Sequence, residues 1–374
     1  MLVPKIRFKE FKNEWHKEKL GKTCSILMCK RIFANQTSNN YEIPFYKIGT
    51  IGTEADTCIS KKLFDEYKEK YNYPRKGELL VTCAGTVGKC LVFDGKDAYF
   101  QDSNIVWIDN PTQVIKNSFL FYLMNNVNWS KLNSTTIVRI YNDNLRNLNL
   151  TFPDVQEQAK IAKFLNLLDK KIQLQQRKIE TLKMYKRGLI QDQAKKSNQW
   201  NEYKISDIFD ITRGVVIPKN SLKSTPDQTY RYPVYSSQTS NYGILGYDRT
   251  YDFDGNYLTW TTDGANAGKV FFRSGKFRCT NVCGVLFSAN NNKFINLLTA
   301  DLLNYETPKY VSYVGNPKLM NNVMGNITVK LPSIQDQEKI SNLFSFINKK
   351  IEEENKYLSK LNCLKKYLLQ NMFI

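Results

Sequence analysis

Histidine is almost absent from this chain, which has one, His16, in 374 residues. This scarcity disfavours histidine-dependent catalytic triads and excludes metal sites that need more than one histidine. Eight cysteines are present without a CxxC pair, so the close thiolate pairs of a structural zinc site are also missing. The sequence has no apolar run near the roughly 18 residues that cross a bilayer, and its start lacks the apolar core of an export signal. We therefore expect a cytoplasmic protein with reduced thiols.

Motifs of nucleotide hydrolysis and methyl transfer are missing as well. The glycine-rich segments at 85–89 and 264–269 lack the GxxxxGK[ST] spacing of a phosphate-binding loop, and strand-like residues follow them. Tight turns between strands explain these segments better. The sequence contains no Asn-Pro-Pro-aromatic motif of an amino-methyltransferase. We expect no catalytic residues, no bound cofactor and no metal in this chain.

Acidic residues are too few to balance the basic ones. The formal net charge is +19 and the isoelectric point is near 9.4, which points to a polyanionic partner. Two repeated segments, described next, carry +5 and +2, so +12 of the +19 lies outside them. Basic charge in globular parts of the chain favours nucleic-acid binding over a merely solvated helix face.

The sequence contains an internal repeat. Residues 153–191 match residues 332–370 without a gap, 179 positions later, with 12 of 39 positions identical. Pro153 and Pro332 open the two copies, which fits proline's preference for the first turn of a helix. One long helix is therefore used twice, each time after a globular block.

Both copies place apolar residues at alternating spacings of four and three, which is typical of a coiled-coil seam. The predicted seam comprises Ile161, Leu165, Leu168, Ile172, Ile179, Leu182 and Leu189 in the first copy, and Ile340, Phe344, Ile347, Ile351, Leu358, Leu361 and Leu368 in the second.

Polar residues interrupt the seam at equivalent places in the two copies: Gln175 and Glu354, then Lys186 and Lys365. If a two-fold axis relates the repeats, the two helices pair antiparallel. Gln175 then lies opposite Glu354 at the midpoint and can hydrogen-bond to it. Two independent helices, each packed on its own block, remain the alternative.

The two globular blocks are also similar in sequence pattern. Both contain short β-branched and aromatic stretches separated by Gly-, Asp- and Asn-bearing turns. Each block is expected to hold a strand-rich core and a helix, near 117–127 and 292–304. The predicted fold is α+β, with two pseudo-repeated mixed α/β domains that are separated and followed by long helices pairing as an antiparallel coiled coil. The predicted boundaries are 1–152 for the first domain, 153–193 for the first helix, 194–331 for the second domain and 332–374 for the second helix.

These features resemble the DNA-specificity subunits of type I restriction–modification systems. The duplicated P-x-[VI]-Q-[ED]-Q-x-K-I opening of each long helix is the most specific part of the resemblance. The W-x-x-x-x-[LI] motifs at Trp15 and Trp200 and the Gly-Lys turns are also similar to that family's target-recognition domains.

The resemblance implies a non-catalytic subunit that binds double-stranded DNA. Each domain would read one half of a bipartite, asymmetric site. The coiled coil would set the spacer length and dock two modification (methyltransferase) subunits. S-adenosylmethionine is then expected on those partners, and ATP on the restriction subunits that translocate and cut DNA.

Polar and basic residues in turns and loops are the expected DNA contacts, because phosphate contacts position a reader and base-edge contacts specify the sequence. Lys89 and Lys269 are the best phosphate candidates, since they occupy matching places, and the segment 236–241 suits adenine reading by an amide. The candidates are Lys47, Thr82, Thr86, Lys89, Thr135, Thr136 and Arg139 in the first block, and Ser236, Ser237, Gln238, Asn241, Thr262, Asn266, Lys269, Asn316 and Lys318 in the second.

Three alternatives remain open from the sequence. The first keeps the family and changes the system, to the specificity subunit of a fused restriction–methyltransferase that cuts on both sides of its site. The second is a coiled-coil protein adaptor without a DNA role. The third, a stand-alone nuclease or methyltransferase, is disfavoured by the missing motifs.

Overall fold

The computed structural model describes residues 2–129, 139–195, 200–288 and 292–374. It divides into two compact units, Met1–Leu174 with Leu358–Ile374, and Gln175–Tyr357. Each unit therefore contains one globular block and a part of both long helices. Thr135 and Thr136, two of the predicted DNA contacts, lie outside the described residues.

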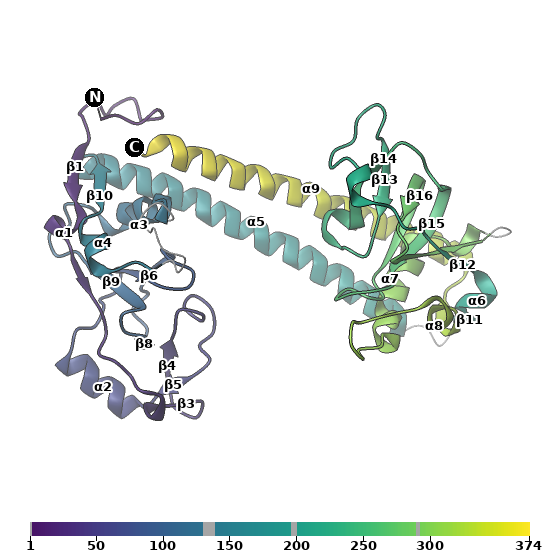
Figure 1. Ribbon diagram of the computed structural model, residues 1–374, viewed down its shortest axis with the longest axis horizontal. Helices are drawn as coiled ribbons and strands as arrows, with labels where there is room; N and C mark the ends of the chain where they lie inside the picture. The colour runs from purple at the N-terminus through teal and green to yellow at the C-terminus, as the bar shows by residue number, and fades with distance from the viewer. Residues whose placement is uncertain (1, 130–138, 196–199, 289–291) are drawn as a thin grey trace. The chain divides into compact units, whose positions relative to one another are not determined.

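The first unit is built from short strands and helices around the beginning of the first long helix (Figure 1). Its strands are β1 (His16–Lys19), β2 (Ser25–Leu27), β3 (Thr37–Ser38), β4 (Ile43–Tyr46), β5 (Cys58–Ile59), β6 (Leu79–Thr82), β7 (Cys90–Val92), β8 (Tyr99–Phe100), β9 (Ile105–Asp109) and β10 (Asn149–Phe152). Its short helices are α1 (Leu20–Thr23), η1 (Ala34–Gln36), α2 (Lys61–Lys70), α3 (Asn117–Asn126) and α4 (Asn142–Arg146). One sheet has the order β2-β9-β6-β7, another the order β3-β5-β4-β8, and β1 pairs with β10.

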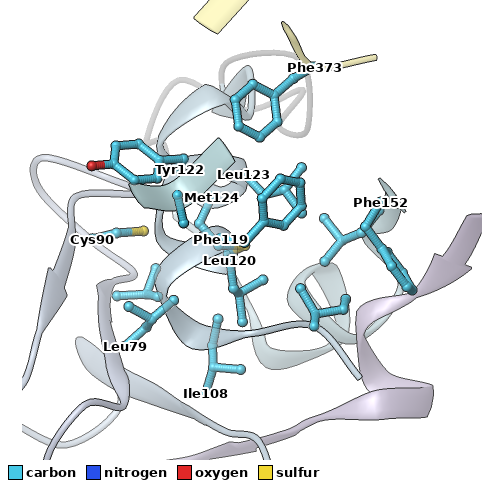
Figure 2. Close-up of a cluster of buried hydrophobic side chains, with 14 of the residues drawn as sticks. Leu79, Cys90, Ile108, Phe119, Leu120, Tyr122, Leu123, Met124, Phe152 and Phe373 are labelled. Atoms are coloured by element: carbon cyan, nitrogen blue, oxygen red, sulfur yellow. The ribbon is translucent and has the colours of Figure 1, made fainter. Parts of the chain in front are cut away.

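The main core of the first unit lies between α3 and the sheet that contains β6 and β9. Leu120 of α3 points toward Leu79 and Ile108 of that sheet, whereas Phe119 points toward Phe373 (Figure 2). All of these side chains are buried. Phe373, near the end of the chain, stacks on Phe119 with ring centroids 5.3 Å apart. Apolar burial of this kind supplies most of the stability of such a domain, so the last residues of the chain are part of the first unit's core.

The second unit repeats the plan with longer strands (Figure 1). Its strands are β11 (Asn201–Lys204), β12 (Asp210–Arg213), β13 (Tyr232–Tyr235), β14 (Ile244–Asp248), β15 (Phe253–Thr261), β16 (Val270–Cys279), β17 (Cys283–Phe287) and β18 (Thr328–Leu331). Its short helices are α6 (Ile205–Ile208), η4 (Lys219–Ser221), η5 (Ser240–Gly243), η6 (Asn292–Phe294), α7 (Leu297–Glu306), η7 (Thr307–Tyr310) and α8 (Asn321–Asn326). The sheet order is β12-β17-β15-β16-β13-β14, and β11 pairs with β18.

The core of the second unit is centred on Trp260, which is fully buried on β15. Its indole Nε1 donates a hydrogen bond to Leu319 O at 3.0 Å. A Cβ atom at Gly284 on the neighbouring strand would lie 2.3 Å from the indole ring, so only glycine fits there. The helices predicted near 117–127 and 292–304 are present as α3 and α7, with α7 displaced by a few residues.

The long helices α5 (Val155–Lys195) and α9 (Ile334–Met372) begin two residues after the prolines of the repeat. Pro153 and Pro332 therefore precede the helices and do not form their first turns. The second glutamine of each P-x-[VI]-Q-[ED]-Q motif has a structural role at the start of its helix. Gln158 Nε2 donates to Pro153 O at 2.7 Å and Gln337 Nε2 donates to Pro332 O at 3.0 Å, with both glutamines 1 % exposed. Each glutamine thus ties the turn before its helix to the helix itself.

The predicted seam residues lie between the helices. Nine of the fourteen are buried and the other five are partly buried. Within the second unit, Gln175 lies against Glu354, and Lys186 Nζ lies 5.7 Å from the centre of the Phe344 ring. Residue numbers rise along α5 as they fall along α9, so the two helices pair antiparallel.

Each polar residue that interrupts the seam has a hydrogen-bond or ion-pair partner. Gln175 Nε2 donates to Glu354 Oε2 at 2.6 Å, which is the midpoint contact that the repeat predicts. Lys365 forms an ion pair with Asp169 at 2.6 Å, within the first unit. Lys186 forms one with Asp301 of α7 at 2.7 Å, within the second. Partnered polar groups in an apolar seam fix the register of a helix pair.

Candidate nucleic-acid interface

A tight turn between β6 and β7 is the first element of the candidate interface. Thr82 holds it, because its hydroxyl donates to Thr86 O and accepts the Lys89 N–H at 3.0 Å. The Gly88 N–H closes the turn on Thr82 O at 2.7 Å. Gly88 has φ +78°, and a Cβ there would lie 2.1 Å from Trp129 Nε1, so glycine is required. These hydrogen bonds hold the turn, which presents Thr86 to solvent.

The second unit contains the same turn between β15 and β16. The Thr261 hydroxyl donates to Asn266 O and accepts the Lys269 N–H at 3.1 Å. The Gly268 N–H donates to Thr261 O at 2.8 Å. Thr261, 179 positions after Thr82, is therefore the structural counterpart of Thr82. Sequence reasoning selected the next residue, Thr262, instead.

Two of the threonines predicted as DNA contacts, Thr82 and Thr262, are buried. Thr82 is 0 % and Thr262 is 1 % exposed. Thr82 is used in the turn, and the Thr262 hydroxyl donates to Asp263 Oδ2 at 2.7 Å. Their side chains build the turn and its surroundings rather than face solvent. Thr86 and Asn266, at the tips, are exposed.

A basic residue lies beside the first turn. The Cys83 N–H donates to Asn104 O at 2.7 Å, and the Ile140 N–H donates to Cys83 O at 2.8 Å. These bonds bring Arg139 next to the turn, where its Nη2 lies 3.5 Å from Ser103 Oγ. The structure thus brings Ser103 and Arg139 together beside the turn, although they are distant from each other in sequence.

The second unit places a basic residue in the same way. The Leu319 N–H donates to Thr262 O at 2.9 Å, and Lys318 Nζ lies 3.8 Å from Asp263 Oδ1. Lys318 is 179 positions after Arg139, so the repeat extends to these two cations. Both were predicted as DNA contacts, and the structure puts each beside its turn.

Lys89 and Lys269 differ, although the sequence pairs them. Lys89 Nζ donates to Ile51 O at 2.6 Å, which braces the loop that follows β4. Lys269 is exposed. The Lys89 ammonium is therefore held by protein. The Lys269 side chain reaches solvent, but partial burial of its ammonium, near Asp301 and Lys186, lowers its pKa.

Lys47 lies beside a hollow of about 320 Å³ in the first unit. Its Nζ forms an ion pair with Asp56 at 3.1 Å. Arg31 and Ser103 line the same hollow, and Arg31 is paired with Asp102 at 2.9 Å. Arg31 was not among the predicted residues, because no motif marks an isolated arginine in a loop.

The loop 236–243 between β13 and β14 supplies the remaining candidates. The Thr280 hydroxyl donates to Ser236 Oγ at 3.0 Å, and Gln238 Nε2 donates to Ile244 O. Ser236, Ser237 and Gln238 are partly buried, whereas Asn241 is exposed with φ +47°. Asparagine tolerates this left-handed conformation better than most residues. Asn241 is therefore the candidate whose amide faces solvent from this loop.

Arg273 packs against that loop, and it was not among the residues predicted from the sequence. It is 6 % exposed, its Nε donates to Thr259 Oγ1 at 3.1 Å, and its guanidinium lies 3.6 Å from the centre of the Tyr235 ring. Burial lowers the pKa of Arg273 from its ordinary value. A Cβ at Gly243 would lie 3.0 Å from Nη2. Only burial distinguishes this arginine from the chain's many exposed cations, and burial cannot be read from a single sequence.

The described residues include no group of histidine, cysteine, aspartate or glutamate side chains that could hold a metal ion. Among the same residues, no helix is both long enough and apolar enough for a transmembrane segment.

Comparison with known proteins places these features in a family. The type I restriction modification DNA specificity domain matches residues 12–184 and again 197–362. A Haemophilus influenzae protein, provisionally named as a type I restriction enzyme specificity subunit, is 46 % identical over 147 residues, which is 39 % of this chain and 38 % of that protein. The type I restriction enzyme MpnII specificity subunit of Mycoplasma pneumoniae is 42 % identical over 146 residues, covering 38 % of this chain and 43 % of that one. The matches thus span less than half the length of these two relatives.

A solved structure shares the fold across the whole chain. The S subunit of a type I restriction–modification system from M. genitalium aligns with a TM-score of 0.65 and 17 % identity, covering 100 % of this chain and 99 % of that one. With a family domain matched twice over most of its length, the chain belongs to the type I restriction–modification DNA-specificity family.

Proposed function

We propose that this chain is a non-catalytic specificity subunit in which each unit reads one half of a bipartite, asymmetric site in double-stranded DNA. The observation that carries the proposal is the repeated interface. Each unit has one threonine-held turn with one basic residue beside it, Arg139 in the first and Lys318 in the second. Two copies of one reading device that differ in their exposed side chains suit two different half-sites.

The long helices are proposed to set the spacer between the half-sites. α5 has 41 residues and α9 has 39, which corresponds to about 60 Å each at 1.5 Å per residue. The partnered polar residues of the seam favour one register of the pair, and a fixed register gives a fixed spacer.

The helices also carry exposed apolar residues at repeated positions beside the seam. Leu167 of α5 is 57 % exposed, and its repeat partner Phe346 of α9 is 69 % exposed. Each of these residues directly precedes a seam residue. The exposed apolar residues nearby are Phe164, Leu364 and Tyr367 in the first unit, and Met184, Tyr185 and Leu343 in the second.

We call these two sets the apolar flanks. When a two-fold axis relates two antiparallel helices, the residues that directly precede seam positions lie on the same face of the pair in both helices. Each unit therefore presents one apolar flank, and exposed apolar clusters mark interaction sites. Two equivalent flanks fit two copies of one partner. We propose that the partners are two modification subunits.

The chemistry is proposed to reside on the partners. S-adenosylmethionine would be bound by the modification subunits, and ATP by the restriction subunits. This chain would contribute DNA recognition and the arrangement of the assembly.

The test is to map methylated bases by single-molecule sequencing, in cells that carry this chain with its neighbouring modification subunit. The expected result is one motif with two short half-sites around a fixed unspecified spacer. Replacing residues 1–152 by the corresponding block of another family member should then change one half-site only. If no methylation depends on this chain, the specificity role is wrong and a protein-adaptor role takes its place.

A further inference from the structure

A short hairpin beside the second turn exposes apolar side chains that the fold does not need. Ser312 and Lys318 exchange two backbone hydrogen bonds of 2.9 Å each. They close a tip in which Val314 is 93 % and Tyr313 is 69 % exposed. Covering apolar surface of this kind with a partner lowers the free energy. While it is exposed, it does not stabilise the unit.

The hairpin is held in a fixed place at the candidate interface. Lys318 at its base lies 3.8 Å from Asp263 Oδ1, and the Gly264 N–H donates to Pro317 O at 2.9 Å. Asn316 in the tip is exposed. The exposed valine therefore lies in one hairpin with an amide that can read adenine and a cation that can contact phosphate.

We propose that Val314 contacts the methyl group of a thymine in the major groove of the second half-site, which rests on the proposed DNA-reading function. The thymine C5-methyl is the apolar feature of the groove floor, and small apolar side chains recognise it. Val314 is short and β-branched, so it suits a methyl contact. Side chains that wedge between base pairs are typically longer or bulkier, such as phenylalanine, leucine and methionine.

The experiment uses the complex of this chain with its modification subunit and duplexes that carry the mapped site. Thymines of the second half-site are replaced one at a time by deoxyuridine, which removes only the methyl group. For the wild type, binding should weaken about three- to fivefold at one of these positions, the effect of one buried methyl group. The Val314→Ala complex should bind the normal site about three- to fivefold more weakly and lose nothing further with deoxyuridine. Val92→Ala, which changes a 49 % exposed valine of the first unit, should behave as the wild type.

Two results would overturn the inference and leave the proposed function intact. One is a Val314→Ala complex that keeps the full methyl dependence of the wild type; a common loss of affinity on all duplexes would then indicate a wedge or a non-specific contact. The other is a second half-site without an A·T pair. A wild-type complex that shows no site preference would instead contradict the proposed function itself. Val314→Ala changes an exposed side chain, so loss of folding is not expected.

Discussion

The apolar flanks predict the stoichiometry of the assembly. We expect Leu167→Asp to remove one modification subunit from the complex and Phe346→Asp to remove the other. The double variant should bind none. Both side chains are more than half exposed in the isolated chain, so neither substitution should reduce its stability appreciably.

The magnitude follows from the exposed fractions. Full burial of a leucine or phenylalanine contributes about 1.5–3 kcal/mol, so the remaining 57 % of Leu167 and 69 % of Phe346 are worth about 1–2 kcal/mol each. A carboxylate buried without a partner adds about 1–3 kcal/mol or more. The sum, about 2–5 kcal/mol, weakens binding at the altered flank roughly 30-fold or more.

The assay is titration calorimetry of the chain with purified modification subunit, with masses of the complexes checked by light scattering. The wild type should bind two subunits and each single variant one. The matched control is Asn166→Asp, which introduces the same charge one residue before Leu167. If both single variants still bind two subunits with unchanged affinity, the assignment of the apolar flanks is wrong. If either variant loses both subunits, the two flanks do not act as independent sites.

Three further predictions concern the seam, the basic residues and the turn. The pKa of Glu354 is lowered from 4.5 to about 2 by the hydrogen bond from the opposing glutamine and by neighbouring lysines. Its contribution to stability should therefore be complete above pH 4.5 and lost as the pH falls toward 2; thermal unfolding of Glu354→Gln should lack this part of the acid dependence, and identical profiles would refute the assignment. Arg139→Ala and Lys318→Ala should each reduce the slope of log K against log salt by about 1 without changing the recognised motif; unchanged slopes in binding titrations would remove these residues from the phosphate contacts. Gly88→Ala should lower the free energy of unfolding by about 1–3 kcal/mol in a denaturant titration, whereas Gly49→Ala, where a Cβ meets nothing within 4 Å, should not; equal effects would mean that the turn does not require its glycine.

The helices were the part of the fold most accessible from sequence. A heptad pattern is local, and the repeat relates its two copies residue by residue. The antiparallel pairing and the Gln175–Glu354 contact followed from this spacing once a two-fold axis was assumed between the repeats. The helix starts were displaced by two residues. The prolines at 153 and 332 precede the helices, and the buried Gln158 and Gln337 were not recognised as the side chains that fix these starts.

The candidate interface was harder to predict from the sequence than the helices, because its residues come together only after folding. Sequence reasoning found Arg139 and Lys318 but could not know that backbone bonds place each beside its turn. It chose Thr262 over Thr261, since two adjacent threonines look alike until the strand shows which one faces the turn. Arg273 was missed because only its burial against aromatic rings distinguishes it. That burial depends on a loop distant in sequence.

The contact between Gln175 and Glu354 has an evolutionary consequence. At this point of the pairing a residue meets its own repeat, as it would in a symmetric dimer of two half-length chains. In such a dimer of the second half, glutamate would face glutamate, and the two charges would repel. With glutamine opposite, Nε2 donates to the carboxylate at 2.6 Å, and Lys178 adds an ion pair at 2.7 Å. Divergence at one duplicated position thus makes the second half a better partner for the first half than for a copy of itself, which favours keeping the two different halves in a single assembly.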